Sequence, residues 1–191
     1  MSHSSIEIEI KLPLHNPDEV KAFLDKEAEI KAKDVMQRDT YYVPAHRDFL
    51  DRKYVAEWLR LRESTKGYSV NYKHFYPEDV PVTEYCDEFE TTVNDVEAMK
   101  KIFGALNMKE AVVVEKYRTT RMYEEVEIVI DQVTDLGGFI ELECKKEFPT
   151  PQEAKTYLYS VLDKLGAKCG ETDHRGYPFW LLEKKGYKFG E

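Results

Sequence analysis

The patterned part of the chain opens with Ile6-Glu7-Ile8-Glu9-Ile10-Lys11-Leu12, in which charged and apolar residues alternate strictly. In a β-strand, successive side chains point to opposite faces, so residues two apart share a face. We therefore expect Glu7, Glu9 and Lys11 on one face of a strand and the isoleucines on the other. The apolar face has to be covered, and helices packed against the sheet would do this most economically.

The same alternation returns along the whole chain, and the sign of the charge changes from segment to segment. In chain order the charged positions are Arg60 and Arg62, Glu88 and Glu90, Lys116 and Arg118, Asp131, and Glu141 and Glu143. For any single segment, an amphipathic strand with a solvated polar face gives the same pattern. Repeated over many segments, with acids and bases on separate strands, the pattern predicts a charged interior that binds an anion together with its metal ions.

Composition limits the classes to which the protein can belong. A chain of 191 residues with 42% hydrophobic and 13% aromatic residues predicts one globular domain spanning residues 1–191. The net charge of −9 argues against general nucleic-acid binding through a basic surface. No apolar run approaches the roughly 18 residues that a membrane span needs, and the N-terminus lacks the apolar region of a signal peptide. We therefore expect a cytoplasmic protein with neither nucleic acid nor membrane as its partner.

Helices and strands are predicted from the spacing of apolar residues. Helical spacing occurs near 17–31, 95–106, 151–165 and 178–185. Alternation predicts strands near 36–43, 56–63, 68–75, 83–92, 110–121, 123–131 and 139–146, with a hairpin turn at Ser64-Thr65-Lys66-Gly67. In each half of the chain an acidic strand is followed by a helix, a pattern consistent with a two-fold internal duplication.

The ordered charged positions resemble those of a known family. Glu7-x-Glu9-x-Lys11 alone is common in charged strands, but it is followed by the basic and acidic pairs and by Leu136-Gly137-Gly138-Phe139-x-Glu141-x-Glu143. Over nearly the whole chain this set resembles the CYTH family, also called triphosphate tunnel metalloenzymes. The resemblance implies an α+β fold: a closed antiparallel β-barrel of about eight strands, forming a tunnel with a charged interior and with helices packed outside.

The resemblance also implies a small-molecule triphosphate as partner and Mg²⁺ or Mn²⁺ as cofactor. Arginine binds phosphate oxygens bidentately, and lysine acts as a point charge. The expected substrate-binding residues are Lys11, Trp58, Arg60, Arg62, Lys73, Lys116, Arg118 and Arg175. Carboxylate oxygens suit Mg²⁺, and the expected metal ligands are Glu7, Glu9, Asp131, Glu141 and Glu143. The expected catalytic residues are Lys11, Lys73, Glu88 and Glu90, and the two glutamates either bind metal directly or hold its ligands in place.

Two of these assignments have structural alternatives. Lys116, like Lys145, can instead form a cross-strand salt bridge inside the barrel. The alternation places Trp58 on the same face as Arg60 and Arg62. Its indole can stack on an organic cation or a base, or it can simply close the mouth of the tunnel.

The resemblance leaves the reaction open. Trp58-Leu59-Arg60-Leu61-Arg62 is similar to the Trp-Leu-Arg-x-Arg of animal thiamine triphosphatases, whereas the spacing from Lys116 to Glu143 and the tail from Arg175 look like those of class IV adenylyl cyclases. The N-terminal His-Phe signature of bacterial cyclases is missing, since Ser4 follows His3. Three functions remain: hydrolysis of a triphosphate, which we favour, closure of ATP to cyclic AMP and pyrophosphate, and non-catalytic binding of a nucleotide or polyphosphate. The oligomeric state is also open, a homodimer being one option.

Overall fold

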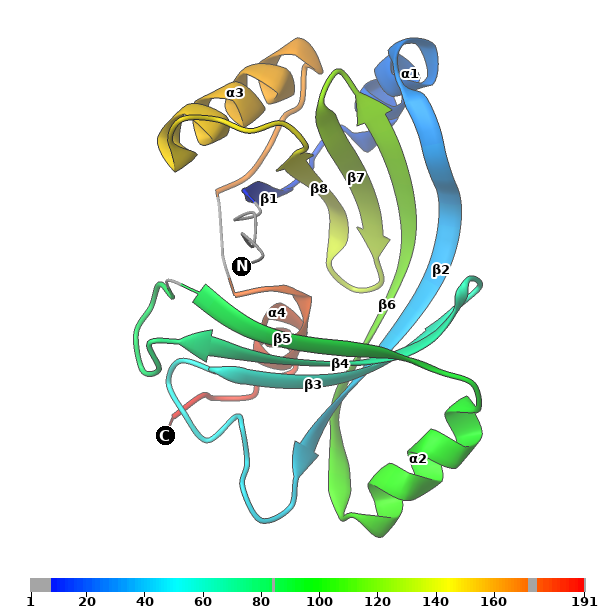
Figure 1. The fold of residues 1–191 in the computed structure, drawn as a ribbon, viewed down its shortest axis with the longest axis vertical. Helices are drawn as coiled ribbons and strands as arrows, with labels where there is room; N and C mark the ends of the chain where they lie inside the picture. Colours follow the sequence, from blue (N-terminus) through cyan, green and yellow to red (C-terminus); the bar gives the residue numbers. More distant parts are fainter. Residues whose placement is uncertain (1–7, 84, 172–174, 191) are drawn as a thin grey trace. The chain divides into compact units, whose positions relative to one another are not determined.

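The computed structural model describes residues 8–83, 85–171 and 175–190 (Figure 1). Over these residues the chain forms an eight-stranded antiparallel sheet with strand order β1-β8-β7-β6-β2-β3-β4-β5. The elements are β1 (Glu9–Pro13), α1 (Pro17–Glu27), β2 (Glu29–Pro44), β3 (Glu57–Ser64), β4 (Gly67–Tyr76), β5 (Tyr85–Val93), α2 (Val96–Ala105), β6 (Met108–Tyr123), β7 (Val126–Val133), β8 (Gly137–Cys144), α3 (Pro151–Lys164) and α4 (Tyr177–Lys184). The predicted fold class is confirmed, while closure of the sheet into a barrel stays a prediction.

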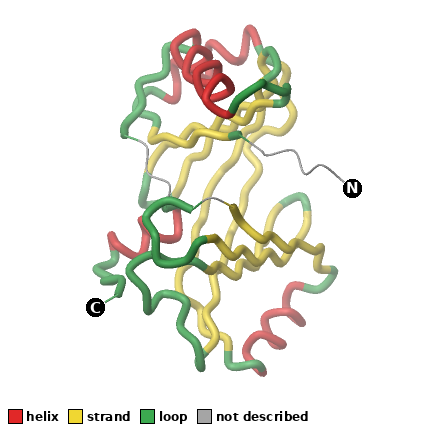
Figure 2. Tube along the Cα trace, turned by 60° about the vertical axis from the view of Figure 1, so that its left-hand side comes forward, coloured by secondary structure: helices red, strands yellow, loops and turns green. Residues whose placement is uncertain are grey.

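The chain divides into two compact units. Unit 1 comprises Met1–Val35 and Tyr117–His174, and unit 2 comprises Met36–Lys116 and Arg175–Glu191. The strands β2 and β6, each 16 residues long, contribute residues to both units; strands are yellow in Figure 2. The expectation that residues 1–191 form a single domain stays a prediction.

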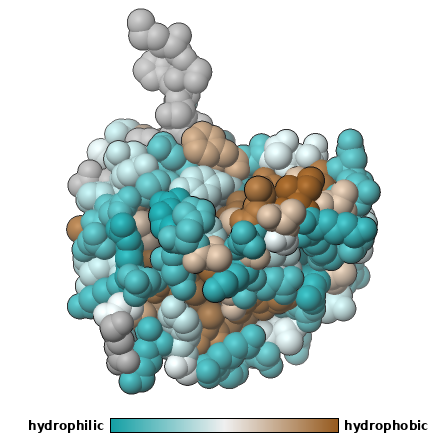
Figure 3. Space-filling view, turned by 90° about the horizontal axis from the view of Figure 1, so that it is seen from below, coloured by the Kyte–Doolittle hydropathy of each residue, from teal (hydrophilic) through white to brown (hydrophobic). Residues whose placement is uncertain are grey.

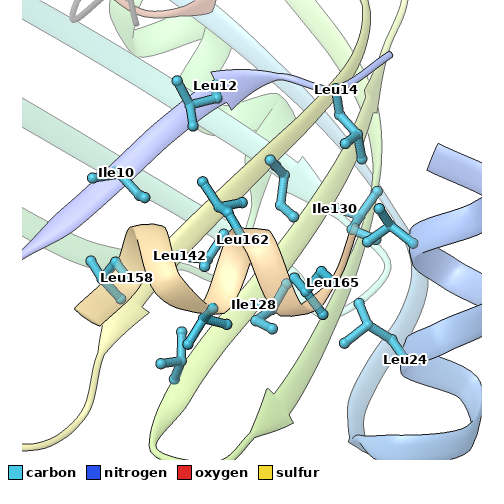
Figure 4. Packing of buried hydrophobic residues seen from close by; sticks show 14 residues of the cluster. Ile10, Leu12, Leu14, Leu24, Ile128, Ile130, Leu142, Leu158, Leu162 and Leu165 are labelled. Carbon is cyan, nitrogen blue, oxygen red and sulfur yellow. The ribbon is translucent and has the colours of Figure 1, made fainter. Parts of the chain in front are cut away.

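The core of unit 1 lies between the apolar face of β1, β8 and β7 and the helices α1 and α3. In Figure 4, Leu158 and Leu162 of α3, and Leu165 just after the helix, lie against the sheet residues Ile128 and Leu142. Ile128, Leu142 and Leu158 are fully buried. Burial of such side chains contributes roughly 1.5–3 kcal/mol each. The prediction that helices cover the apolar face is therefore confirmed in this unit.

Two local features shape unit 1. Helix α1 begins with Pro17 at its first position, as predicted, but ends at Glu27 instead of continuing to about residue 31. Ala28 is already extended, and β2 starts at Glu29, so strand pairing replaces the last predicted turn. At the other end of the sheet, a Cβ on Gly138 would lie 3.0 Å from the carbonyl oxygen of Leu14. Glycine therefore allows the backbone amide of Leu14 to reach the Gly138 carbonyl at 2.8 Å.

Unit 2 is a meander of β2, β3, β4 and β5 with α2 on its apolar face. The predicted hairpin turn is confirmed, because Ser64 pairs with Gly67 across it. Asp95 caps α2 by accepting a hydrogen bond from the amide of Ala98 at 2.9 Å. Phe103 of α2 is buried in the apolar cluster of this unit. Helix α4 also belongs to unit 2 and buries most of its apolar side chains.

Some apolar side chains remain exposed at the surface. Figure 3 shows a mostly hydrophilic face on which apolar side chains gather in patches. Among the exposed apolar residues are Ile102 and Leu106, in and just after α2, with 50% and 62% of their surface accessible. No helix in the described part of the chain has both the length and the apolar character that a membrane crossing requires.

Candidate functional site

Unit 2 gathers basic side chains around one buried carboxylate. Asp39 of β2 lies opposite Arg62 of β3 in the register of the sheet. Arg62 donates from Nε to Oδ1 at 2.6 Å and from Nη2 to Oδ2 at 2.7 Å, a bidentate pair. Lys116 Nζ and Arg60 Nη1 each lie 4.0 Å from Asp39 Oδ2. We call Arg60, Arg62 and Lys116 the basic cluster.

Within the basic cluster, Arg60 contacts protein carboxylates at longer distances than Arg62 does. Besides the 4.0 Å approach to Asp39, its Nη2 lies 3.6 Å from Glu90 Oε1. Its buried Nε–H has no hydrogen-bond partner among the described residues. An unpaired buried donor is uncommon in folded proteins and needs an explanation. Arg60 is therefore bound less closely by protein carboxylates than Arg62 is, and its role in substrate binding stays a prediction.

Lys116 is placed differently from the two arginines. Only 4% of its surface is accessible, and its ammonium lies 5.0 Å from the ring centroid of Tyr177 in α4. Lys116 therefore forms a salt bridge with Asp39, which is the structural alternative that the sequence left open for it. Its role in substrate binding stays a prediction.

The pKa values of Asp39 and Tyr41 follow from burial together with the neighbouring charges. Burial alone would raise the pKa of Asp39, but the hydrogen bonds and charge of Arg62 lower it below the usual value. Burial, reinforced by the Asp39 carboxylate, raises the pKa of Tyr41 to about 12. At neutral pH the region therefore contains a charged aspartate and an uncharged phenol beside the cationic side chains.

The predicted catalytic residues of unit 2 lie on neighbouring strands. Lys73 of β4 is opposite Glu88 of β5, and its ammonium is 3.1 Å from Glu88 Oε2. Asn71 donates to the same carboxylate at 2.7 Å, and Ser69 donates to Glu90 at 3.0 Å. Although burial opposes ionisation, the bonds from Asn71 and Lys73 lower the pKa of Glu88. The structure thus brings Lys73 and Glu88 together as an ion pair.

The register also settles the face on which Trp58 lies. Trp58 pairs with Lys73, two positions from the pairing of Arg60 with Asn71, so Trp58 shares the face of the arginines as expected. Its ring contacts Tyr41 edge-on, with centroids 5.4 Å apart. Arg175 stacks on the ring of Phe179, with its Cζ 4.3 Å from the centroid.

Unit 1 holds most of the predicted metal ligands on adjacent strands. Glu9 of β1 lies opposite Glu143 of β8, which lies opposite Glu127 of β7. Lys145 Nζ approaches Glu143 Oε1 at 2.5 Å and Glu127 Oε1 at 4.0 Å. Lys145 therefore forms the structural salt bridge that the sequence left open for it. Glu7 lies outside the described residues.

A second charged group follows along the same face of unit 1. Lys11 Nζ is 2.8 Å from Glu141 Oε2, and Arg118 Nη2 is 3.6 Å from the same oxygen. Arg118 also forms a bidentate pair with Asp131, which is 1% exposed. Burial would raise the pKa of Glu141, but Lys11 and Arg118 lower it below the usual value. Glu141 is therefore ionised at neutral pH, as a metal ligand has to be.

These carboxylates are suitable donors but are not assembled into a metal cage. Hard oxygen ligands match Mg²⁺ and Mn²⁺. No group of three or more potential ligand side chains among the described residues is positioned to hold an ion. Instead Lys11, Arg118 and Lys145 neutralise the carboxylates. The carboxylate oxygens suit a divalent cation chemically. In this structure the positive charge beside them comes from Lys11, Arg118 and Lys145.

Sequence reasoning did not select two residues that the structure places in these groups. The alternation along each strand gives the face on which Asp39 and Glu127 lie, but it selects neither of them as a site residue. The strand register puts Asp39 beside Arg62 and Glu127 beside Glu143. The alternating pattern shows the face on which each of them lies, but it does not show which residues lie beside them.

A surface depression elsewhere in unit 2 contains none of the predicted residues. It has a volume of about 420 Å³ and is lined by Ala45, His46, Gly104, Leu106, Asn107, Met108 and Lys109.

Comparison with known proteins identifies the family and agrees with the fold. The model of the CYTH domain matches residues 5–177. The putative adenylate cyclase MJ0240 of Methanocaldococcus jannaschii is 33% identical over 138 residues, which are 72% of this chain and 76% of the relative. The chain therefore belongs to the CYTH family.

Solved structures share the fold. The PH1819 protein of Pyrococcus horikoshii OT3 is 29% identical with a TM-score of 0.71, and the match covers 93% of this chain and 99% of that one. A Hippeastrum protein, described as a putative adenylyl cyclase, HpAC1, with a dominant triphosphatase activity, is 16% identical with a TM-score of 0.61. That match covers 96% of this chain and 98% of the other. At this identity it supports the fold alone.

Proposed function

We propose that the protein is a metal-dependent enzyme that binds a small-molecule triphosphate and hydrolyses it. The observation that carries the proposal is Arg60, a guanidinium with a buried Nε–H that has no partner among the described residues and only long contacts to Asp39 and Glu90. Like charges gathered in a partly buried region repel one another, and an incoming polyanion relieves that repulsion. Arg60, Arg62 and Lys73 of unit 2 are assigned to the phosphate oxygens.

The acidic strands of unit 1 are assigned to the cofactor. Mg²⁺ or Mn²⁺ would be held by Glu7, Glu9, Asp131, Glu141 and Glu143, and would supply charge neutralisation for the phosphates and a more acidic water. Lys11, Arg118 and Lys145 now neutralise these carboxylates. Lys11 and Arg118 are also the residues assigned to phosphate oxygens, and a bound cation would supply part of the positive charge that they now give to these carboxylates.

Hydrolysis needs little covalent chemistry from the protein. Phosphoryl transfer is catalysed mainly by positioning the phosphate and by neutralising the charge that spreads over its oxygens. Lys11 and Lys73 supply positive charge. Glu88 and Glu90 hold Lys73 and Arg60 in place through ion pairs at 3.1 and 3.6 Å. These four residues are the assigned catalytic set. Water attacks the terminal phosphorus, the bond from that phosphorus to the bridging oxygen breaks, and orthophosphate and the diphosphate leave.

A second candidate is the cyclisation of ATP to cyclic AMP and pyrophosphate. It is favoured by the similarity to the relative from Methanocaldococcus jannaschii, whose name describes a putative adenylate cyclase. The two reactions share every assigned residue and differ in the nucleophile. Water attacks the γ-phosphorus in hydrolysis, and the ribose 3′-hydroxyl attacks the α-phosphorus in cyclisation. A cytoplasmic location and a homodimer remain predictions.

One experiment separates these functions. The protein is incubated with ATP, thiamine triphosphate or inorganic triphosphate, each with Mg²⁺, with Mn²⁺ or with chelator, and orthophosphate, pyrophosphate and cyclic AMP are resolved chromatographically. Release of orthophosphate that depends on the metal is the expected result. Cyclic AMP formed together with pyrophosphate would establish the second candidate. Tight binding without any product would show a binding module, and the absence of both binding and turnover would refute the proposal.

A further inference from the structure

We infer that Asp39 is a positioning residue that fixes Arg62 and allows Arg60, Arg62 and Lys116 to lie together as one phosphate-binding cluster. The inference rests on the proposed function, because Asp39 has this task only if the cluster binds phosphate. It assigns no contact between Asp39 and substrate.

Asp39 is buried and is bound by Arg62 through two hydrogen bonds. Asp39 is 1% exposed, so its carboxylate is out of reach of a ligand in solution. Both of its oxygens accept hydrogen bonds from Arg62, at 2.6 and 2.7 Å. Two parallel bonds fix the plane and the direction of a guanidinium, which a single bond cannot do. The pair uses Nε and Nη2 of Arg62, so Nη1 is the nitrogen that lies outside it.

Asp39 also balances part of the positive charge of the basic cluster. Lys116 and Arg60 lie 4.0 Å from Asp39 Oδ2, so this one carboxylate lies beside three cations, of which Arg60 also approaches Glu90 at 3.6 Å. It lowers the repulsion among them without cancelling their positive charge, which remains in excess. Lys116, at 4% exposure and with Tyr177 on its other side, is held in this group by Asp39 and the ring. Asp39 therefore permits a dense cationic group to exist before any substrate arrives.

Positioning and simple charge attraction predict opposite effects for Asp39→Asn. If charge alone mattered, removal of a negative charge beside three cations would tighten the binding of a polyanion. If Asp39 positions Arg62, the amide of asparagine breaks the pair, because its NH₂ group cannot accept from the guanidinium. Binding then weakens although the site has become more positive.

The test measures the dissociation constant of inorganic triphosphate by calorimetry, and KM and kcat for the best substrate at saturating metal. We expect Asp39→Asn to raise the dissociation constant and KM about tenfold or more, the scale of one lost charged hydrogen bond. Asp39→Glu should recover part of that loss. Glu57→Gln is the matched control, since Glu57 is 7% exposed and binds Arg47 at 2.6 Å and Tyr72 at 2.5 Å in the same unit. It should lower the melting temperature without changing affinity.

Arg62→Lys gives a second measurement should Asp39→Asn fail to fold. This variant keeps the charge but cannot form the bidentate pair, and it should also raise the dissociation constant about tenfold or more. Unchanged or tighter binding in Asp39→Asn or in Arg62→Lys would overturn the inference while leaving the proposed function intact. An equal loss in Glu57→Gln would likewise overturn it. If the wild-type protein binds no triphosphate, the proposed function fails, and the positioning role fails with it.

Discussion

Arg118 binds both carboxylate oxygens of Asp131, with Nε 2.8 Å from Oδ1 and Nη2 2.6 Å from Oδ2. Arg62 and Asp39 form the same side-on pair in unit 2, and each aspartate is 1% exposed. Each unit thus contains one buried aspartate bound by an arginine from a different strand. The order along the chain differs, because Asp39 precedes Arg62 whereas Arg118 precedes Asp131, so the internal duplication stays a prediction.

Loss of Arg118 should destabilise the protein in a way that a divalent cation relieves. Arg118→Met removes the bidentate partner of a buried carboxylate, and we expect the free energy of unfolding to fall by about 3–5 kcal/mol. If Asp131 is a metal ligand, added Mg²⁺ or Mn²⁺ should raise the melting temperature of this variant more than that of the wild type.

Arg121→Met is the control for that measurement. Arg121 is also buried in unit 1 and also binds a carboxylate, that of Asp25. Its loss should lower stability without creating a larger response to metal. An equal response to metal in both variants would remove Asp131 from the proposed metal site.

Neutralising the acidic pair on β8 should abolish metal-dependent turnover. Glu141→Gln and Glu143→Gln each remove a charged oxygen ligand while keeping the shape of the side chain. We expect both proteins to remain folded by circular dichroism and to lose activity with Mg²⁺. Glu147→Gln, at an exposed position just after β8, should keep full activity. Near-normal activity in either β8 variant would refute the metal assignment.

The arginines of β3 should carry a large share of substrate affinity. Arg60→Ala and Arg62→Ala should each weaken triphosphate binding by about 1.5–3 kcal/mol, the value of a hydrogen bond to a charged group. Arg38→Ala provides the comparison, because Arg38 lies on the other face of β2 and pairs with Glu115 at 2.5 Å. Affinity should be measured by calorimetry, and an unchanged value in both β3 variants would place these arginines outside the binding site.

Trp58 should distinguish an organic from an inorganic substrate. If the substrate carries a base or a thiazolium, Trp58→Ala removes a stacking contact of about 1–3 kcal/mol. Turnover of inorganic triphosphate should then be nearly unaffected, whereas KM for the organic substrate rises. Equal losses for both would mean that Trp58 acts only by packing beside Arg60 and Tyr41, whose ring it contacts.

We expect the ionisation of Asp39 to make the free energy of unfolding depend on pH. Its pKa in the folded protein lies below the ordinary value of 3.8, so its stabilisation is present above that value and is lost as the pH falls through the folded pKa. In urea titrations between about pH 6 and 2, the free energy of unfolding of Asp39→Asn should start lower and fall less steeply than that of the wild type. Parallel curves would show that Asp39 is not held as a charged group.

Much of the fold could be predicted because it depends on local patterns. Alternation identified the strands, and helical spacing with capping residues identified α2 and α3. Parity placed Trp58 with Arg60 and Arg62, and the register of β3 with β4 bears this out. The end of α1 was wrong by a few residues because the helical pattern continues while the chain has already turned into β2. Tertiary pairing there outweighed local propensity.

What the sequence determined by itself is the face on which each charged side chain lies. That property is local, because successive residues of a strand point to opposite sides whatever their neighbours are. The partners of those side chains were decided by the tertiary structure. Arg62 meets Asp39 across 23 positions of sequence, and Lys11 near the start of the chain meets Glu141 of β8. Register joins residues far apart in the chain and is set by turns and core packing over whole strands, so no local pattern reveals it.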